Sequence, residues 1–288
     1  MSDFFAAVER RRTVRAFLQD LVPEEILDRC LDAARLAPSS SNLQPWEFVL
    51  IRDPSKRRLA ERICFDQRPA RSAPLLLAVV AHAETWRRNR DEVLRIHRER
   101  GSARPSTERY YRKLIPLVYR TGPFGIGGWI KRIFSRAASL FRPAPNLHGA
   151  ADVRVMVHKT TALAAQTFML ALSAEGYDSC PMEGFDPWRA RKLLELPRGA
   201  EVCMFLAVGK RAPDGVWWER ALVPREWAVR SVCRSVDRNS GRLRVWVALG
   251  CQPAVLRFPQ QQEQQQVETH REHGGFRPGC AAREPSRT

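Results

Sequence analysis

Short apolar runs that alternate with amphipathic stretches constrain the fold of this chain more than any other feature of its sequence. WEFVLI (46–51) and PLLLAVVAH (74–82) each predict a short buried strand. AEVCMFLAVGKR (200–211) is a longer continuous apolar run and predicts a central strand. Because helical stretches separate these runs, the pattern indicates an α/β arrangement.

Four stretches have the apolar spacing of helices. The first begins at Pro23 with acidic residues in its first turn and stops before Pro38. The most apolar one ends at Gly176, where a glycine cap is expected, and its internal polar residues exclude a transmembrane span. The four helices are expected over residues 23–37, 55–63, 153–174 and 187–196.

The net charge of +17 is unevenly distributed along the 288 residues. Residues 85–150 hold 15 Lys/Arg against 4 Asp/Glu, and residues 231–288 hold 9 against 5, so the rest of the chain carries only +2. We therefore expect one domain over residues 1–230 with a basic helical insert at 85–150. A basic, Gln-rich tail follows at 231–288 and is expected to be disordered.

A charge of this size raises the question of an anionic partner, either nucleic acid or a membrane surface. No RNA- or DNA-binding module accompanies the charge, so we expect no nucleic-acid partner. A basic nucleic-acid-binding or membrane-surface protein is kept as the alternative class. Within the insert, residues 124–141 have an apolar stripe at helical spacing. We expect a lid or partner-facing helix with a buried stripe, and contact with a membrane surface is the alternative.

The N-terminal residues MSDFFAAVERRR lack the apolar segment of a secretory signal, so we expect a cytoplasmic protein. The seven cysteines have no metal-binding spacing, which indicates reduced thiols and no metal site. Cys180 has no histidine nearby in the sequence, and we expect it to pack rather than to act as a nucleophile. His158 is expected to make a packing contact or a hydrogen bond, with a catalytic role as the alternative.

Three polar segments carry the candidate chemistry. LAPSSSNLQPWEFVLI (36–51) places small hydrogen-bonding groups between a helix and a strand, where they either bind a planar heteroaromatic ligand or form a turn. RRRTVRAF (10–17) is a dense donor array for a phosphate and a ring edge, or else a solvated helix end. CPMEGFDP (180–187) breaks between strand and helix at Glu183 and Gly184, where the backbone either approaches a ligand or turns.

The order and spacing of these segments resemble those of the nitroreductase family of FMN-dependent NAD(P)H oxidoreductases. The resemblance covers residues 4–230 and rests on the patterns RRxxRxF, APSSxNxQPWxF and PxEGF. It implies an α+β fold, a three-layer α/β/α sandwich in which helices flank a mixed, mainly antiparallel sheet. It also implies a homodimer with FMN at the subunit interface.

By position, the resemblance assigns cofactor contacts to each segment. Arg11, Arg12 and Thr13 correspond to phosphate contacts. Arg15 corresponds to the cation at the N1/C2 carbonyl edge of the flavin, where it favours the reduced anionic ring. The loop that usually reaches the flavin from the other subunit comprises Pro38, Ser39, Ser40, Asn42 and Gln44. The segment that packs along the ring comprises Pro181, Met182, Glu183 and Gly184.

The family often adds a second pair of basic residues for the phosphate. Arg220 matches the first member of that pair, but the second position is Leu222. Phosphate binding is therefore expected to rely more on Arg11 and Arg12, or to use Arg225. A flavin-binding protein without turnover is an alternative that this departure leaves open.

The resemblance further implies a ping-pong reaction in which NAD(P)H reduces FMN and an oxidised small molecule, such as a nitroaromatic or a quinone, takes the electrons. Because the flavin performs the redox step, no catalytic side chain is expected. The insert lies where this family covers the substrate side of the flavin, and its arginines are expected to attract NADPH. We expect four of its aromatic residues to shape the acceptor pocket: Tyr110, Tyr111, Phe124 and Trp129.

Overall fold

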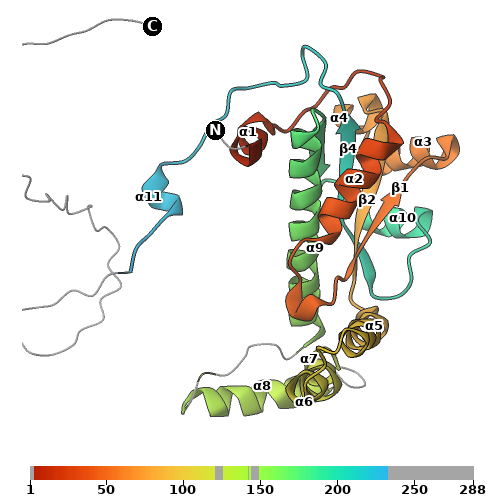
Figure 1. Cartoon of the computed structure of the whole chain (residues 1–288). Coiled ribbons are helices and arrows are strands. Elements are labelled where there is room, and N and C mark those ends of the chain that lie inside the picture. The colour runs from red at the N-terminus through yellow and green to blue at the C-terminus, as the bar shows by residue number, and fades with distance from the viewer. Residues whose placement is uncertain (1–2, 121–125, 142, 144–148, 233–288) are drawn as a thin grey trace, which may run out of the picture. The chain divides into compact units, whose positions relative to one another are not determined.

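The computed structural model describes residues 3–120, 126–141, 143 and 149–232 of the chain (Figure 1). The chain divides into two units, Met1–Arg220 and Ala221–Thr288. Of the described elements, only α11 (Arg225–Ala228) belongs to the second unit. Residues 233–288 lie outside the described residues, so the predicted domain at 1–230 and disordered tail at 231–288 stay predictions.

A four-stranded sheet forms the centre of the first unit. Its strands lie in the order β1-β2-β4-β3, and each neighbouring pair is antiparallel. A parallel bridge between Thr13 and Ser179 continues the sheet beyond β3, so the sheet is mixed and mainly antiparallel, as predicted. The strands are Trp46–Leu50 (β1), Leu75–His82 (β2), Asp178–Met182 (β3) and Ala200–Gly209 (β4).

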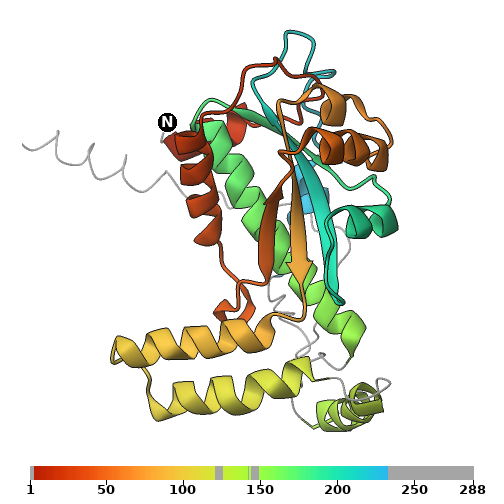
Figure 2. The same cartoon turned by 90° about the vertical axis from the view of Figure 1, so that its right-hand side faces the viewer.

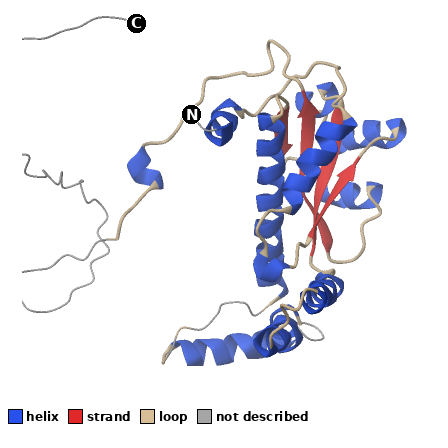
Figure 3. Cartoon of the chain, viewed as in Figure 1, coloured by secondary structure: helices blue, strands red, loops and turns tan. Residues whose placement is uncertain are grey.

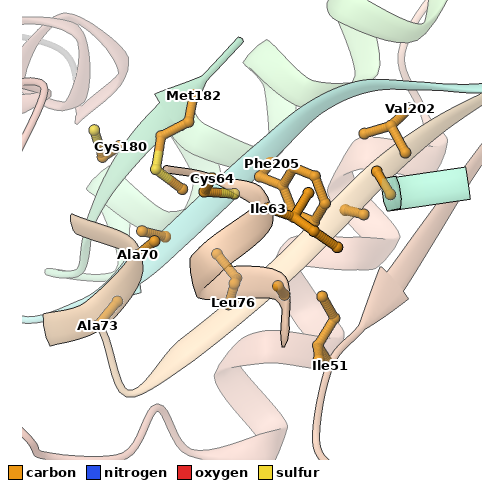
Figure 4. Close-up of a cluster of buried hydrophobic side chains, with 14 of the residues drawn as sticks. Ile51, Ile63, Cys64, Ala70, Ala73, Leu76, Cys180, Met182, Val202 and Phe205 are labelled. Carbon is orange, nitrogen blue, oxygen red and sulfur yellow. The ribbon is translucent and has the colours of Figure 1, made fainter. Parts of the chain in front are cut away.

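Helices cover both faces of this sheet (Figures 2 and 3). On one face, α2 and α9 enclose an apolar cluster that includes the fully buried Phe168. On the other face, α3, α4 and α10 close a second cluster that includes the fully buried Phe205 (Figure 4). The predicted α+β fold, a three-layer α/β/α sandwich, is thereby confirmed. These helices are Glu24–Arg35 (α2), Pro54–Ile63 (α3), Arg68–Ser72 (α4), Ala150–Ala174 (α9) and Pro187–Leu193 (α10).

The first strand corrects one prediction, because β1 is half-buried and not buried. It lies at an edge of the sheet and pairs with β2 alone. Glu47 is exposed, and its Oε2 lies 2.7 Å from Nε2 of His82 on β2. A short apolar run does not distinguish an edge strand from a central one, since only the sheet order decides how many neighbours cover it. The two central strands, β2 and β4, are buried as predicted.

Local chemistry sets the ends of three helices. Asp53 begins α3, accepting hydrogen bonds from the backbone N–H groups two and three residues later at 2.9 and 2.8 Å. Asp186 begins α10 in the same way, at 3.1 and 3.0 Å. Gly176 follows α9 with φ +85°, a left-handed conformation that favours glycine, so the predicted cap is confirmed.

The described residues of the basic insert form several helices, and part of them packs against the N-terminal half of α9. Trp86, Tyr111 and Ile115 share an apolar cluster with Val157. Phe134 belongs to the apolar stripe of α8 and is 72% exposed, so the described residues do not bury this part of the stripe. The elements are Trp86–Glu99 (α5), Pro105–Arg109 (α6), Tyr110–Leu114 (η2, a π-helical turn), Ile115–Tyr119 (α7) and Ile126–Ser139 (α8). None of the described helices has the length and apolar composition needed to cross a membrane.

Asp178, the first residue of β3, is a buried charge that joins the sheet to two distant arginines. Its side chain is 2% exposed and accepts hydrogen bonds from Arg211 Nε at 2.9 Å and Nη2 at 2.5 Å. Arg10 Nη2 lies 3.7 Å from the same carboxylate. The carboxylate raises the pKa of Arg211, mainly through these hydrogen bonds, so the guanidinium stays charged.

We expect Asp178→Asn to lower the free energy of unfolding by roughly 2–3 kcal/mol, because the neutral amide leaves the arginines without their counter-charge. Urea denaturation measures this loss. The control is Asp32→Asn, which removes an exposed pair with Arg35 (2.8 Å) and should cost less than about 1 kcal/mol. An equally small loss in both variants would contradict a structural role for Asp178.

Candidate functional site

The segment after α1 (Asp3–Arg10) lies extended beside β3. The Val14 N–H donates to the Ser179 carbonyl at 3.2 Å, and the Arg15 N–H donates to the Gly215 carbonyl at 2.7 Å. Val14 is fully buried, whereas Arg15 is half-buried, as the alternation of an extended chain requires. Backbone pairing therefore fixes where the basic side chains of this segment emerge.

Arg11, Arg12 and Arg15, here called the arginine cluster, are half-buried. Within the described ranges, no carboxylate lies within ion-pair distance of any of the three, although neighbouring Arg10 has one. Arg12 donates instead to the Trp218 carbonyl, and the Arg15 guanidinium lies 4.8 Å from the Trp217 ring centroid. Partly desolvated cations so close in sequence favour a bound anion.

The end of β3 lies next to this cluster. Thr13 bridges to Ser179, and the charge of Arg15 lowers the pKa of the Cys180 thiol, so this segment lies beside Ser179 and Cys180. Glu183 and Gly184 follow and are exposed, while Met182 is buried. The structure thus brings together two of the three predicted segments.

Gln67 joins this part of the site, although the sequence gave no reason to single it out. Its Nε2 donates to the Gly184 carbonyl at 2.6 Å. The two residues before it, Phe65 and Asp66, have φ of 57° and 50°. They form a left-handed turn directly before Gln67. Neither residue is a glycine, so the sequence does not predict a left-handed turn at this position.

Cys180 is not an activated thiol. It is 3% exposed and belongs to the cluster beneath α3, α4 and α10 (Figure 4). Burial raises the pKa of its thiol to about 11, because the thiolate would lose its hydration, and the charge of Arg15 offsets this only in part. The prediction that Cys180 packs is confirmed.

The third predicted segment, the loop at residues 38–44, is held by its own hydrogen bonds and by two tyrosines. Ser39 Oγ accepts from the Gln44 N–H at 3.1 Å, and Ser40 Oγ lies 3.3 Å from Met156 Sδ. Ser41 Oγ lies 2.7 Å from Tyr110 OH, and Tyr111 OH donates to the Ser41 carbonyl at 3.1 Å. Pro38 and Asn42 are exposed. Three loop residues have left-handed φ, which is costly without glycine: Ser41, Asn42 and Gln44.

The loop and the residue before the arginine cluster contact helix α9 at different points along its length. Ser40 contacts Met156 near one end of α9, and Arg10 Nη1 donates to the Ser173 carbonyl near the other at 2.6 Å. These contacts are 17 residues apart along one helix, which corresponds to about 25 Å at the usual helical rise. The loop and Arg10, the residue next to the arginine cluster, therefore contact opposite ends of α9.

The remaining predicted residues have mixed outcomes. Arg220 Nη2 donates to the Arg11 carbonyl at 2.7 Å and to the Glu9 carbonyl at 2.9 Å, so it reaches the arginine cluster. Tyr110 and Tyr111 hold the loop, and Tyr111 is buried. Phe124 and the side chain of Trp129 lie outside the described residues, so the acceptor pocket stays a prediction.

Two cavities in the described part of the chain lie away from the arginine cluster. One, of about 970 Å³, is lined by loop residue Gln44, by Phe48 of β1 and by Asn89 of α5. The other, of about 610 Å³, is lined by His158 and Glu201. His158 Nε2 lies 3.3 Å from Glu201 Oε2, which confirms the predicted hydrogen bond. No group of three or more ligating side chains among the described residues has the arrangement of a metal site.

Comparison with known proteins places this fold and these segments in one family. Residues 8–210 match the family model described as "Nitroreductase family". The chain belongs to the nitroreductase family. This membership agrees with the resemblance carried by the three polar segments and with the observed three-layer fold.

Relatives within the nitroreductase family match most of the chain. A protein of Thermus thermophilus named "NADH dehydrogenase" is 30% identical over 74% of this chain and 89% of its own. "Protein DrgA" of Synechocystis is 31% identical over 77% of this chain and 90% of its own. Among solved structures, a candidate nitroreductase of Exiguobacterium sibiricum in complex with FMN has a TM-score of 0.60 at 20% identity. The alignment covers 80% of this chain and 98% of that one.

We expect Cys180 to resist iodoacetamide at pH 8 in the folded chain. With a thiol pKa raised to about 11, roughly 0.1% of it is thiolate at that pH. Peptide mass spectrometry measures its alkylation, with urea-unfolded protein as the control. Reaction as fast in the folded chain as in urea would contradict the assigned burial.

Proposed function

We propose that this chain is an FMN-dependent oxidoreductase that passes electrons from NAD(P)H to an oxidised small molecule, such as a nitroaromatic or a quinone, by a ping-pong mechanism. Membership of the nitroreductase family supports this proposal. It is supported further by the name of the Thermus relative, a NADH dehydrogenase, and by the FMN complex of the Exiguobacterium structure. A cytoplasmic homodimer with FMN at the subunit interface is part of the proposal.

The observation that carries the proposal is the arginine cluster without a counter-charge. FMN has a phosphate and a planar ring whose carbonyl edge accepts hydrogen bonds. The cluster supplies three half-buried guanidinium groups for such an anion, and no described carboxylate competes for them. The end of β3 lies beside them with the exposed backbone of Glu183 and Gly184. The donor set of this chain therefore fits the cofactor.

In this proposal, each part of the site has a separate task. Arg11, Arg12 and Thr13 hold the phosphate, assisted by Arg220, which lies against the same backbone. Arg15 faces the carbonyl edge of the ring. The segment along the ring comprises Pro181, Met182, Glu183 and Gly184. When bound, FMN accepts an electron pair from the nicotinamide and gives it to the acceptor, while the protein supplies position and electrostatics.

The loop at residues 38–44 is proposed to act on the site of a second copy. The contacts with α9 support this, because the loop lies near one end of this helix and Arg10, next to the arginine cluster, lies about 25 Å along it. The contacts proposed to come from the second copy are Pro38, Ser39, Ser40, Asn42 and Gln44. Their left-handed backbone, held by Tyr110 and Tyr111, presents the loop in one fixed shape.

The basic insert is proposed to cover the acceptor side of the site. Tyr110 is attached to the loop, so a loop that reaches a second copy brings this tyrosine with it. Tyr111, Phe124 and Trp129 complete the proposed acceptor pocket. The exposed apolar side chains of α8, including Phe134, favour coverage by another surface, either a second chain or a membrane.

We expect Arg15→Ala to weaken FMN binding by about ten- to a hundredfold, because it removes a charge-assisted contact from a half-buried position. Titration of FMN fluorescence with protein measures the dissociation constant. The control is Arg52→Ala, an exposed arginine that pairs with Glu24 at 2.6 Å and should leave the constant unchanged. A parent chain that binds no FMN would remove the proposed function.

We expect anaerobic NADH or NADPH to bleach the flavin absorbance of the FMN-loaded chain in a single phase. Adding a nitroaromatic or a quinone should restore the absorbance after the nicotinamide has left. Stopped-flow spectroscopy measures both half-reactions, and a ping-pong mechanism gives parallel double-reciprocal plots. Flavin that binds but stays oxidised with both nicotinamides would indicate a flavin-binding protein without turnover.

A further inference from the structure

Residues 215–220, here called the tryptophan clasp, are fixed at both ends to the segment that carries the arginine cluster. At one end the Gly215 carbonyl accepts the Arg15 N–H at 2.7 Å. A Cβ on Gly215 would lie 2.5 Å from the Ala16 carbonyl oxygen, so this close approach requires glycine. At the other end Arg220 donates to the Arg11 carbonyl at 2.7 Å.

Two tryptophans lie between these anchors and do not belong to the apolar core. Trp217 is 45% exposed and Trp218 is 69% exposed. Their rings are perpendicular, at 88°, with centroids 5.5 Å apart. Neighbouring exposed indoles are costly on a surface unless something binds them. Both rings lie against one cation, since the Arg15 guanidinium is 4.8 Å from the Trp217 centroid and 5.4 Å from the Trp218 centroid.

The clasp restrains the side chains of Arg15 and Arg12 without supplying a carboxylate. A lone arginine side chain samples many rotamers, and a carboxylate that restricted it would also neutralise it. The face of an indole attracts the guanidinium without adding a negative charge. The Trp218 carbonyl restrains Arg12 in the same manner, as a neutral acceptor. Two cations of the cluster are thus held in place and remain available to an anion.

We propose that Trp217 and Trp218 are positioning residues of the flavin site, which hold the Arg15 guanidinium ready for the carbonyl edge of the cofactor while leaving its charge uncompensated. This inference rests on the proposed function. It assigns a role to a segment that lies far from the arginine cluster in sequence.

The expected result is a change in affinity and in redox potential together. Trp217→Leu should raise the FMN dissociation constant about three- to tenfold, because Arg15 must be ordered when the ligand binds. The midpoint potential of bound FMN should become more negative, since the reduced anionic ring loses a fixed neighbouring cation. Trp217→Phe keeps an aromatic face and should restore most of both values, which a loss of simple packing would not predict.

The matched control is Trp188→Leu on α10. This tryptophan is 61% exposed and lies under Lys192 Nζ at 3.6 Å from its centroid, away from the arginine cluster. The control should keep the parent affinity and potential, and thermal denaturation should show that all the variants fold.

Three outcomes would overturn the inference. If Trp217→Leu keeps the parent's affinity for FMN and the parent's midpoint potential, the inference is wrong and the proposed function is unaffected. Equal losses in Trp217→Phe and Trp217→Leu would assign the effect to packing. A parent chain that binds no FMN would overturn the proposed function and this inference with it.

Discussion

The pairing of residues 13–15 with β3 is the constraint on which the rest of the site depends. One N–H donates to Ser179 and the next to Gly215, so the short segment is held between a strand and the clasp. The buried Asp178 reinforces this arrangement by joining β3 to Arg211 and Arg10. Because the backbone is fixed on both sides, the arginine side chains emerge at set positions instead of sampling solvent.

The charges at this site are arranged for a ligand rather than for the stability of the free chain. Arg10 and Arg211 share a buried carboxylate, whereas the neighbouring arginine cluster pairs with no carboxylate among the described residues. Unneutralised cations so close together raise the energy of the free protein, and an anion recovers that energy on binding. Holding Arg15 with indole rings and Arg12 with a carbonyl preserves this preference, since neither contact cancels a charge.

Much of the fold was predictable because it depends on local patterns. The spacing of apolar residues predicted β2, β4 and the main helices, and Gly176 predicted the end of α9. The exposure of β1 was not predictable, because it depends on sheet order. Patterns also identified the arginine cluster but not its neighbours: Gln67 depends on a turn without glycine, and Trp217 lies about 200 residues away along the chain. That the loop and Arg10 contact opposite ends of α9 follows only from the folded structure.

Our central proposal is that Arg11 and Arg12 bind the phosphate of a flavin whose ring lies against Arg15. Comparing the dissociation constants of FMN and riboflavin, which lacks the phosphate, tests this most directly. We expect FMN to bind at least about a hundredfold more tightly at low ionic strength, with the difference shrinking as salt is added. Equal affinity for the two flavins would contradict a phosphate site at Arg11 and Arg12, and no binding of either would contradict a flavin site.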